Sequence, residues 1–186
     1  MKRRLPLLGG IGLLVLTFGV AYSTPASELI EAPFGATGGE GDRIVSEYIV
    51  AKVHDVAFAD EVELGEWRGT TSGVWLVVDA TFEARLERTG VHVEVLVGGV
   101  RYRASDRADS DTVDGRVIDP GFPVRGVILV ELPSDVRDYA GAASAIVRIA
   151  DSFDSRLASV VEYAVDLTEL RRHDDVELVP VRPGAR

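Results

Sequence analysis

The segment IDPGFPVRGVILVELPSD, residues 118–135, decides the fold of this chain. Pro120 fixes its own φ angle, and Gly121 can adopt the positive φ that the next position of a tight turn requires. Residues 124–132 are then apolar on one alternating face and apolar at the centre of the other, and Pro133 removes a backbone donor and ends the segment. This pattern predicts a central β-strand that is covered on both faces.

Period-two alternation recurs on both sides of this segment. The even positions of residues 74–84 are all apolar, and the odd positions of residues 91–97 are all valine. Because successive side chains of a strand point to opposite faces, each segment predicts a strand with one face in the core. Strands are also expected in residues 47–58, 100–104, 144–153 and 159–167.

The turns between these strands predict an all-β protein. Gly98 and Gly99 suit a tight hairpin, after which Val100 and Tyr102 are expected to point inward. Residues 134–141 are expected to hold a single helical turn, and residues 70–73 a turn before the strand that follows. About seven short strands with few helical residues indicate a sandwich or a small barrel, of which two packed antiparallel sheets are the simpler closure.

The N-terminal residues predict the compartment. Lys2, Arg3 and Arg4 precede an uncharged run of 23 residues from Leu5 to Ser27, which as a helix covers about 35 Å against a bilayer core of about 30 Å. The cations are expected to stay in the cytoplasm and the remaining chain outside it. Either this segment is retained as a single-pass anchor, or it is cleaved as a signal peptide after Ala21-Tyr22-Ser23 or Thr24-Pro25-Ala26, which would make the protein secreted.

The chain therefore divides into four parts. Residues 1–27 are the anchor or signal peptide, and the glycine-rich residues 28–42 are expected to be a flexible spacer. Residues 43–170 form the β-sandwich domain. Residues 171–186 are a tail, expected either to fray or to serve as a partner-binding strand added to a sheet edge.

Composition excludes several classes of function. A net charge of −10 argues against a nucleic-acid surface. An anionic membrane would also repel the acidic body, which argues against peripheral docking driven by charge. The absence of cysteine removes disulfides, thiolate metal sites, cysteine nucleophiles and a lipidated cysteine.

Three features together resemble a known family: the apolar strand in residues 74–84, the glycine hairpin in residues 93–105, and the Pro-Gly turn that leads into residues 126–133. The chain is similar to the small extracytoplasmic immunoglobulin-like sandwiches of Gram-positive bacteria, a family of unknown function related to the immunoprotective extracellular protein type. Pro120, Gly121, Leu132 and Pro133 match its motif, and the resemblance covers about residues 45–168. An Asn frequent after the family's second strand is absent here. The resemblance implies a fold and a compartment, with no shared activity.

The acidic loop over residues 106–115 is the best candidate for a site. Asp109, Asp111 and Asp114 offer the oxygen ligands that calcium prefers, but their spacing does not match an EF-hand loop. The alternatives are a calcium site of another type and a solvated loop.

Trp67 and Trp75 are candidates for partner binding, either as an exposed pair that stacks a sugar or anchors a partner, or as packed core residues. His54, His92 and His173 show no metal-binding spacing, and no nucleophile elbow occurs. We therefore expect no enzymatic activity and no cofactor.

These patterns predict a non-catalytic binding or assembly module outside the cytoplasm, tethered to the membrane and accessory to an envelope complex. Its expected partner is a protein of the cell envelope or membrane. The alternative is a secreted ligand-binding or calcium-binding sandwich that uses the acidic loop.

Overall fold

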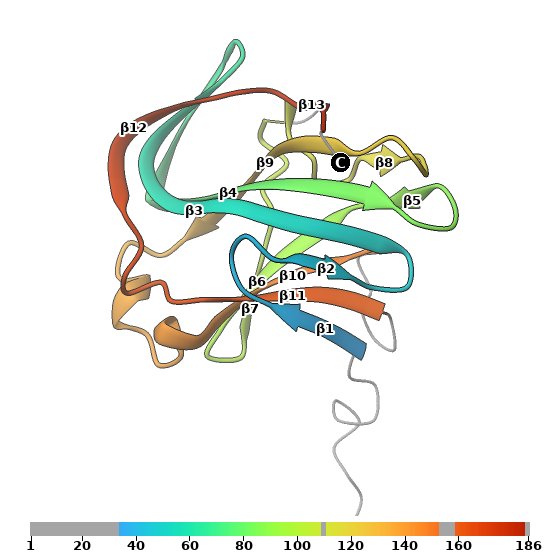
Figure 1. Ribbon diagram of the computed structural model, residues 1–186. Helices are drawn as coiled ribbons and strands as arrows, with labels where there is room; N and C mark the ends of the chain where they lie inside the picture. Colours follow the sequence, from blue (N-terminus) through green and yellow to red (C-terminus); the bar gives the residue numbers. More distant parts are fainter. Residues whose placement is uncertain (1–33, 109–110, 153–158, 185–186) are drawn as a thin grey trace, which may run out of the picture. The chain divides into compact units, whose positions relative to one another are not determined.

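The structure is a computed structural model, and residues 34–108, 111–152 and 159–184 are described below. Two β-sheets pack against each other around a shared core, so this part of the chain is an all-β sandwich (Figure 1). Sheet A has the strand order β1 (Phe34–Gly38), β11 (Ser159–Val165), β10 (Ala145–Ala150), β6 (His92–Val97) and β7 (Val100–Arg103).

Sheet B has the strand order β12 (Arg172–Leu178), β3 (Ile49–Leu64), β4 (Trp67–Ala84), β9 (Val124–Leu132) and β13 (Arg182–Pro183), and β2 (Arg43–Val45) also pairs with β3. A short third sheet joins β5 (Thr89–Gly90) to β8 (Val117–Ile118). Two 3₁₀ turns, Val136–Asp138 and Ala142–Ser144, lead from β9 to β10, and the first confirms the helical turn expected in residues 134–141.

Strand β9 confirms the prediction made from the Pro-Gly segment. Gly121 has a φ of 84°, as the turn after Pro120 requires. Ile128, Val130 and Leu132 join the core between the sheets, whereas Val127 and Leu129 belong to a second apolar cluster on the outer face of sheet B. β9 therefore has a neighbouring strand on each side and apolar contacts on both faces, as predicted.

The seven strands expected from alternation correspond to β3, β4, β6, β7, β9, β10 and β11. Gly98 and Gly99 have φ angles of 57° and 85°, which confirms the hairpin between β6 and β7. The expected inward position of Val100 is wrong, because its side chain is exposed beside the turn. The turn expected in residues 70–73 is also wrong: the chain reverses at Gly65, and residues 71–74 form a bulge within β4.

Six further strands among the described residues were not predicted, and two of them make parallel pairs. β1 pairs in parallel with β11, so residues 34–38 belong to the sandwich and the expected spacer over residues 28–42 is wrong there. β12 pairs in parallel with β3, so the tail in residues 171–186 adds to a sheet edge through residues 172–178 rather than fraying. The expectation of a purely antiparallel sandwich is corrected accordingly.

Tyr163 joins the two sheets through the core. It lies on β11 of sheet A and its side chain is buried. Its hydroxyl oxygen lies 2.5 Å from the carbonyl oxygen of Ala51 and 3.1 Å from that of Asp42, and its single proton is shared between these two acceptors. Burial raises the pKa of this hydroxyl to about 12. A phenol that must stay protonated here therefore fixes sheet A against β3 of sheet B.

The predicted anchor or signal peptide, residues 1–27, lies outside the described residues. In the part of the chain that the structure describes, no helix is long and apolar enough to cross a membrane.

Candidate functional site

The best candidate site forms where the chain crosses from sheet A to sheet B. β7 stays beside β6 as far as Ala104, whose backbone N–H donates to the Val93 carbonyl at 3.1 Å and which also bridges to Val130 of β9. The next residue, Ser105, donates its backbone N–H to the Leu129 carbonyl at 2.7 Å. We call residues 105–116 the crossing loop, because they leave sheet A at this point.

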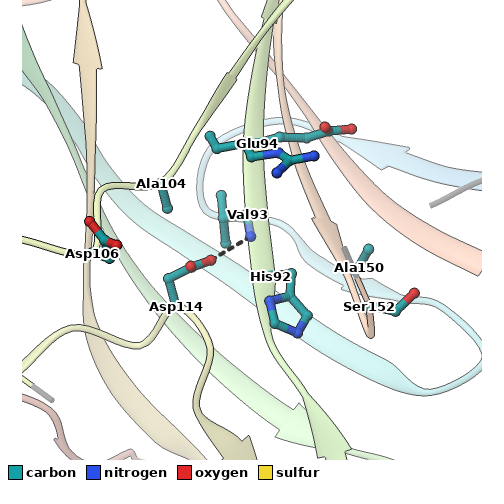
Figure 2. Close-up of a pocket in the computed structure, with 9 residues that line it drawn as sticks. His92, Val93, Glu94, Ala104, Asp106, Asp114, Ala150 and Ser152 are labelled. Carbon is teal, nitrogen blue, oxygen red and sulfur yellow. Dashed lines mark hydrogen bonds between the residues drawn. The ribbon is translucent and has the colours of Figure 1, made fainter. Parts of the chain in front are cut away.

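The crossing loop returns to sheet A beyond the end of β7. Val113 donates its backbone N–H to Val127 of sheet B, and Gly115 then donates its own to the Val91 carbonyl at 2.7 Å. Between these contacts the Asp114 carboxylate accepts a hydrogen bond from the Val93 N–H at 2.8 Å (Figure 2). The loop thus replaces β7 as the hydrogen-bonding neighbour of β6.

A cavity of about 290 Å³ opens between the crossing loop and the edge of sheet A. Six of its nine lining residues are polar or charged, and they come from β6, the end of β7, the loop, and the end of β10 with the residues just beyond it (Figure 2). The residues that line it are His92, Val93, Glu94, Arg103, Ala104, Asp106, Asp114, Ala150 and Ser152. We call this cavity the crossing cleft.

Desolvation dominates the electrostatics of the crossing cleft. Burial raises the pKa of the Asp114 carboxyl, and the nearby negative charge of Asp106 raises it further. The hydrogen bond from the Val93 N–H and the charge of His92 act in the opposite direction. A cationic or hydrogen-bond-donating group entering the cleft would stabilise the Asp114 carboxylate, because it would replace the water that burial removes.

An ion-pair ladder borders the crossing cleft on the outer face of sheet A. Glu94, Arg148 and Glu162 are direct partners in the register of β6, β10 and β11. The guanidinium of Arg148 lies 3.0 Å from a Glu94 oxygen and 2.8 Å from a Glu162 oxygen, and its side chain is only 10% exposed. Arg148 pairs with both carboxylates, so the ladder ties β6, β10 and β11 together beside the cleft and leaves one negative charge in excess.

The structure separates the predicted calcium ligands that it describes. Asp114 contacts β6, whereas Asp111 accepts the backbone N–H of Val181 on its carbonyl and directs its carboxylate toward Gly65. Asp109 lies outside the described residues. Among the residues that are described, no group of three His, Asp or Glu side chains could hold a metal ion. A calcium site formed by Asp109, Asp111 and Asp114 therefore remains a prediction.

Trp67 and Trp75 do meet, but not as an exposed pair. Trp75 is fully buried in the apolar cluster on the outer face of sheet B, and Trp67 packs edge-on against it with the ring centroids 6.0 Å apart. The guanidinium carbon of Arg107 lies 5.3 Å from the centroid of Trp75 and 6.0 Å from that of Trp67. The prediction of a sugar-stacking or partner-binding pair is thus wrong for Trp75, which serves to hold the crossing loop.

The three histidines lie on separate elements. The His54 Nε2 of β3 is 2.8 Å from the Thr81 hydroxyl, and burial followed by the charge of Arg125 lowers its pKa. His173 is exposed on β12. Only His92 lines the crossing cleft.

Sequence reasoning identified the acidic loop but missed the other half of the site. Arg148 interrupts an otherwise apolar strand, and Glu94 interrupts a run of valines. These charges at alternating positions are a signal for a polar outer face. Their pairing depends on the strand order β11-β10-β6, which local alternation does not specify.

No family model matches the sequence, and no curated protein matches it. An uncharacterised β-sandwich protein from Clostridium difficile is 18% identical, with a TM-score of 0.47 over 73% of this chain and 97% of its own. The secreted protein MPT63 from Mycobacterium tuberculosis is also 18% identical, with a TM-score of 0.47 over 71% of this chain and 98% of its own. The YjhA protein from Bacillus subtilis is 12% identical, with a TM-score of 0.45 over 67% of this chain and 98% of its own. Similarity at this level assigns neither a family nor a function to this chain.

Proposed function

We propose that this protein is a non-catalytic extracytoplasmic binding or assembly module, tethered to the cell membrane by residues 1–27 and accessory to an envelope complex. The observation that carries the binding role is the crossing cleft, whose polar lining is held by both sheets through the crossing loop. The tether rests on the basic N-terminus followed by the uncharged run from Leu5 to Ser27. The immunoglobulin-like class and the kinship with the Gram-positive family rest on the Pro120–Pro133 motif.

The chemistry of the cleft indicates what the partner presents. Asp106 and Asp114 offer carboxylate oxygens from the crossing loop, and Glu94 is already paired with Arg148. A lysine or arginine side chain of a protein partner would supply donors to the two loop carboxylates.

Site-specific cross-linking tests this role. A photoactivatable residue at Ser152, which is exposed beside the cleft, should give a discrete cross-linked product in the cells that make the protein. The same residue at Ser144, exposed on the second 3₁₀ turn and absent from the cleft lining, is the matched control. The product should weaken when Asp106→Asn and Asp114→Asn are combined. Identical products from both positions would contradict the proposal.

The intact mass of the native protein tests the tether separately. A retained anchor leaves the full chain of 20.0 kDa, whereas cleavage after the signal-peptide motif removes residues 1–23 or 1–26. Removal of this segment would establish a secreted protein and overturn the tether.

The alternative function is a secreted ligand-binding or calcium-binding sandwich. The observation in its favour is that Asp106 and Asp114 of the acidic loop both line the cleft. Calcium titration followed by thermal unfolding tests it. A melting temperature that rises with calcium and falls again with a chelator would favour this alternative over the assembly module, because a metal that binds only the folded state stabilises it.

A further inference from the structure

Exposed apolar side chains gather at one end of the sandwich. Seven large hydrophobic side chains are exposed among the described residues, and the two most exposed are Phe122 at 73% and Leu86 at 66%. Val117, at 49%, and Val45, at 43%, lie at the same end. The other three are distributed over the hairpin after β6, the 3₁₀ turns and the segment after β12. Single exposed apolar residues are ordinary, but a cluster of this kind marks an interaction surface.

Backbone pairing holds the members of this cluster together. Ala84 bridges to Pro120, and Thr89 of β5 pairs with Ile118 of β8. The loop with Leu86 therefore lies beside the turn with Phe122, and both project from the same end of the ribbon (Figure 1). We call residues 85–88 together with residues 117–122 the apolar tip. Backbone pairing at two points thus places the two loops side by side.

The described chain begins at this same end. Phe34 pairs with Ser159, whose hydroxyl accepts the backbone N–H of Glu47 at 3.0 Å. The Arg85 guanidinium in turn donates to the carbonyl oxygens of Ser46 at 2.7 Å and Glu47 at 3.3 Å. A short series of contacts thus connects the first described residue to the apolar tip.

The length of the preceding chain constrains how far this end can lie from a membrane. Only residues 28–33 separate the predicted span, which ends at Ser27, from Phe34. Even fully extended, these residues and their flanking bonds reach about 25 Å. If residues 1–27 are retained as the proposed anchor, this length keeps Phe34, and with it the end that carries the apolar tip, close to the bilayer.

The charge of the apolar tip suits this surface better than the rest of the protein does. The apolar tip, residues 85–88 and 117–122, carries two arginines against two acidic residues, whereas the whole chain carries 20 basic against 30 acidic residues. Arg88 is largely exposed beside Asp119, with 3.5 Å between them. Arginine side chains next to inserted apolar groups can reach the lipid phosphates while their stems remain in the interface.

We propose that Leu86, Val117 and Phe122 enter the headgroup region of the bilayer and form a second membrane contact beside the N-terminal anchor. The inference rests on the proposed tether, which keeps the tip close to the lipid and removes the need for strong docking by charge. The occupant of the tip is the phospholipid interface. The contact fixes the orientation of the sandwich, and it holds the crossing cleft near the headgroups, since β6 with His92 begins one residue after the end of β5.

Single-cysteine labelling tests this contact, because the chain has no cysteine of its own. The full-length variants Leu86→Cys and Phe122→Cys would be labelled with an environment-sensitive fluorophore and reconstituted into vesicles of phosphatidylcholine and phosphatidylglycerol in equal parts. Val100→Cys and Val179→Cys are matched controls, being similarly exposed away from the tip. A lipid carrying a nitroxide just below the headgroup should quench the tip labels several-fold more strongly than the control labels.

A second variant set separates contact with lipid from damage to the fold. A label at Val117→Cys should lose its quenching when Leu86→Asp and Phe122→Asp are introduced together, while flotation with the vesicles and the melting temperature stay unchanged. Quenching that survives these two charges would overturn the tip contact.

The remaining outcomes distinguish the inference from the proposal on which it rests. Protein that floats with the vesicles while all four labels stay in water overturns the tip contact and leaves the tether. Protein that does not float overturns both. Tip labels that are shielded without quenching by the nitroxide lipid indicate a second copy of the chain or another protein as the occupant, and overturn the inference.

Discussion

The two outer faces of the sandwich are completed in different ways. On sheet B, Trp75, Val127 and Leu129 form an apolar cluster, which Ala108 of the crossing loop and Val176 of β12 cover. On sheet A the corresponding face carries the Glu94–Arg148–Glu162 ladder, in which one arginine pairs with a carboxylate on each neighbouring strand. One face is closed by segments of its own chain, and the other is closed by pairing among its own side chains.

This difference indicates where binding can occur. Trp75 lies at the centre of the apolar outer face and is fully buried there by its own chain, so this tryptophan belongs to stability. A polar outer face bordered by a cleft retains carboxylates whose hydrogen-bonding capacity is only partly used, as Asp114 shows. The proposed function therefore concerns sheet A and the crossing loop rather than the aromatic residues of sheet B.

The largest expected effect comes from removing the centre of the apolar face. Trp75→Ala should lower the free energy of unfolding by about 3–5 kcal/mol, because a fully buried aromatic side chain is replaced by a cavity. Urea unfolding measures this loss. Trp67→Ala is the control and should cost clearly less, since Trp67 is half-buried at the edge of the cluster. Equal costs would mean that the two rings contribute alike and that the face has no buried centre.

The next largest effect comes from breaking the polar face. Arg148→Met leaves two carboxylates with side-chain exposures of 15% and 16% without their cation, which should cost about 3 kcal/mol in urea unfolding. Arg43→Met is the matched control, because Arg43 lies 3.1 Å from Glu83 but is 58% exposed, and an exposed pair of this kind contributes under about 1 kcal/mol. If both variants lose the same amount, the ladder is an ordinary surface network.

The contrast between the faces also shows what alternation can predict. Residues 74–84, 91–97 and 124–132 alternate because one side of each strand is buried, and the period-two pattern records that burial directly. β12 reads RHDDVEL and is mostly exposed, so burial leaves little pattern in it. Its place is set by backbone pairing with β3 and by ion pairs such as Arg172 with Asp60 at 2.6 Å, which no local pattern encodes.

The candidate site was predictable only in part for the same reason. The acidic composition of residues 106–115 marks the crossing loop as a polar surface segment. Its role as a bridge between sheets depends on contacts with Val93, Leu129 and Val127, which are distant in the sequence or belong to the other sheet. Residue spacing does not reveal long-range pairing of this kind. The calcium hypothesis therefore rested on composition alone and could not predict the direction of each carboxylate.

The third prediction concerns Tyr163, which is buried in the core between the two sheets. Tyr163→Phe should cost about 1–2 kcal/mol, since the buried carbonyl of Ala51 loses its donor. Because the folded state raises the pKa of Tyr163 to about 12, the neutral phenol stabilises the fold fully below pH 10, and this contribution is lost as pH rises from about 10 to about 12. Thermal unfolding across this alkaline range should therefore fall more steeply in the natural protein than in Tyr163→Phe. If the melting temperatures of the two proteins fell in parallel as pH rises, the buried hydroxyl of Tyr163 would not contribute to stability as proposed.

The smallest effect on stability is expected at the loop that joins the two faces. Asp114→Asn keeps an oxygen to accept the Val93 N–H and removes a carboxylate whose pKa is raised by burial. A raised carboxyl pKa means that the protonated form favours folding at low pH, and that this contribution is lost as pH rises through the folded pKa. At neutral pH the free energy of unfolding of Asp114→Asn should therefore equal that of the natural protein or exceed it by up to about 1 kcal/mol. At acidic pH, where Asp114 of the natural protein is protonated, the two free energies should come closer together. Urea unfolding at neutral and acidic pH measures both values. The same variant should weaken the cross-link formed from position 152, because the proposed partner binds the negative charge of Asp114, whereas folding does not require that charge. A marked loss of stability together with an intact cross-link would make Asp114 a structural residue and leave the crossing cleft without its central carboxylate.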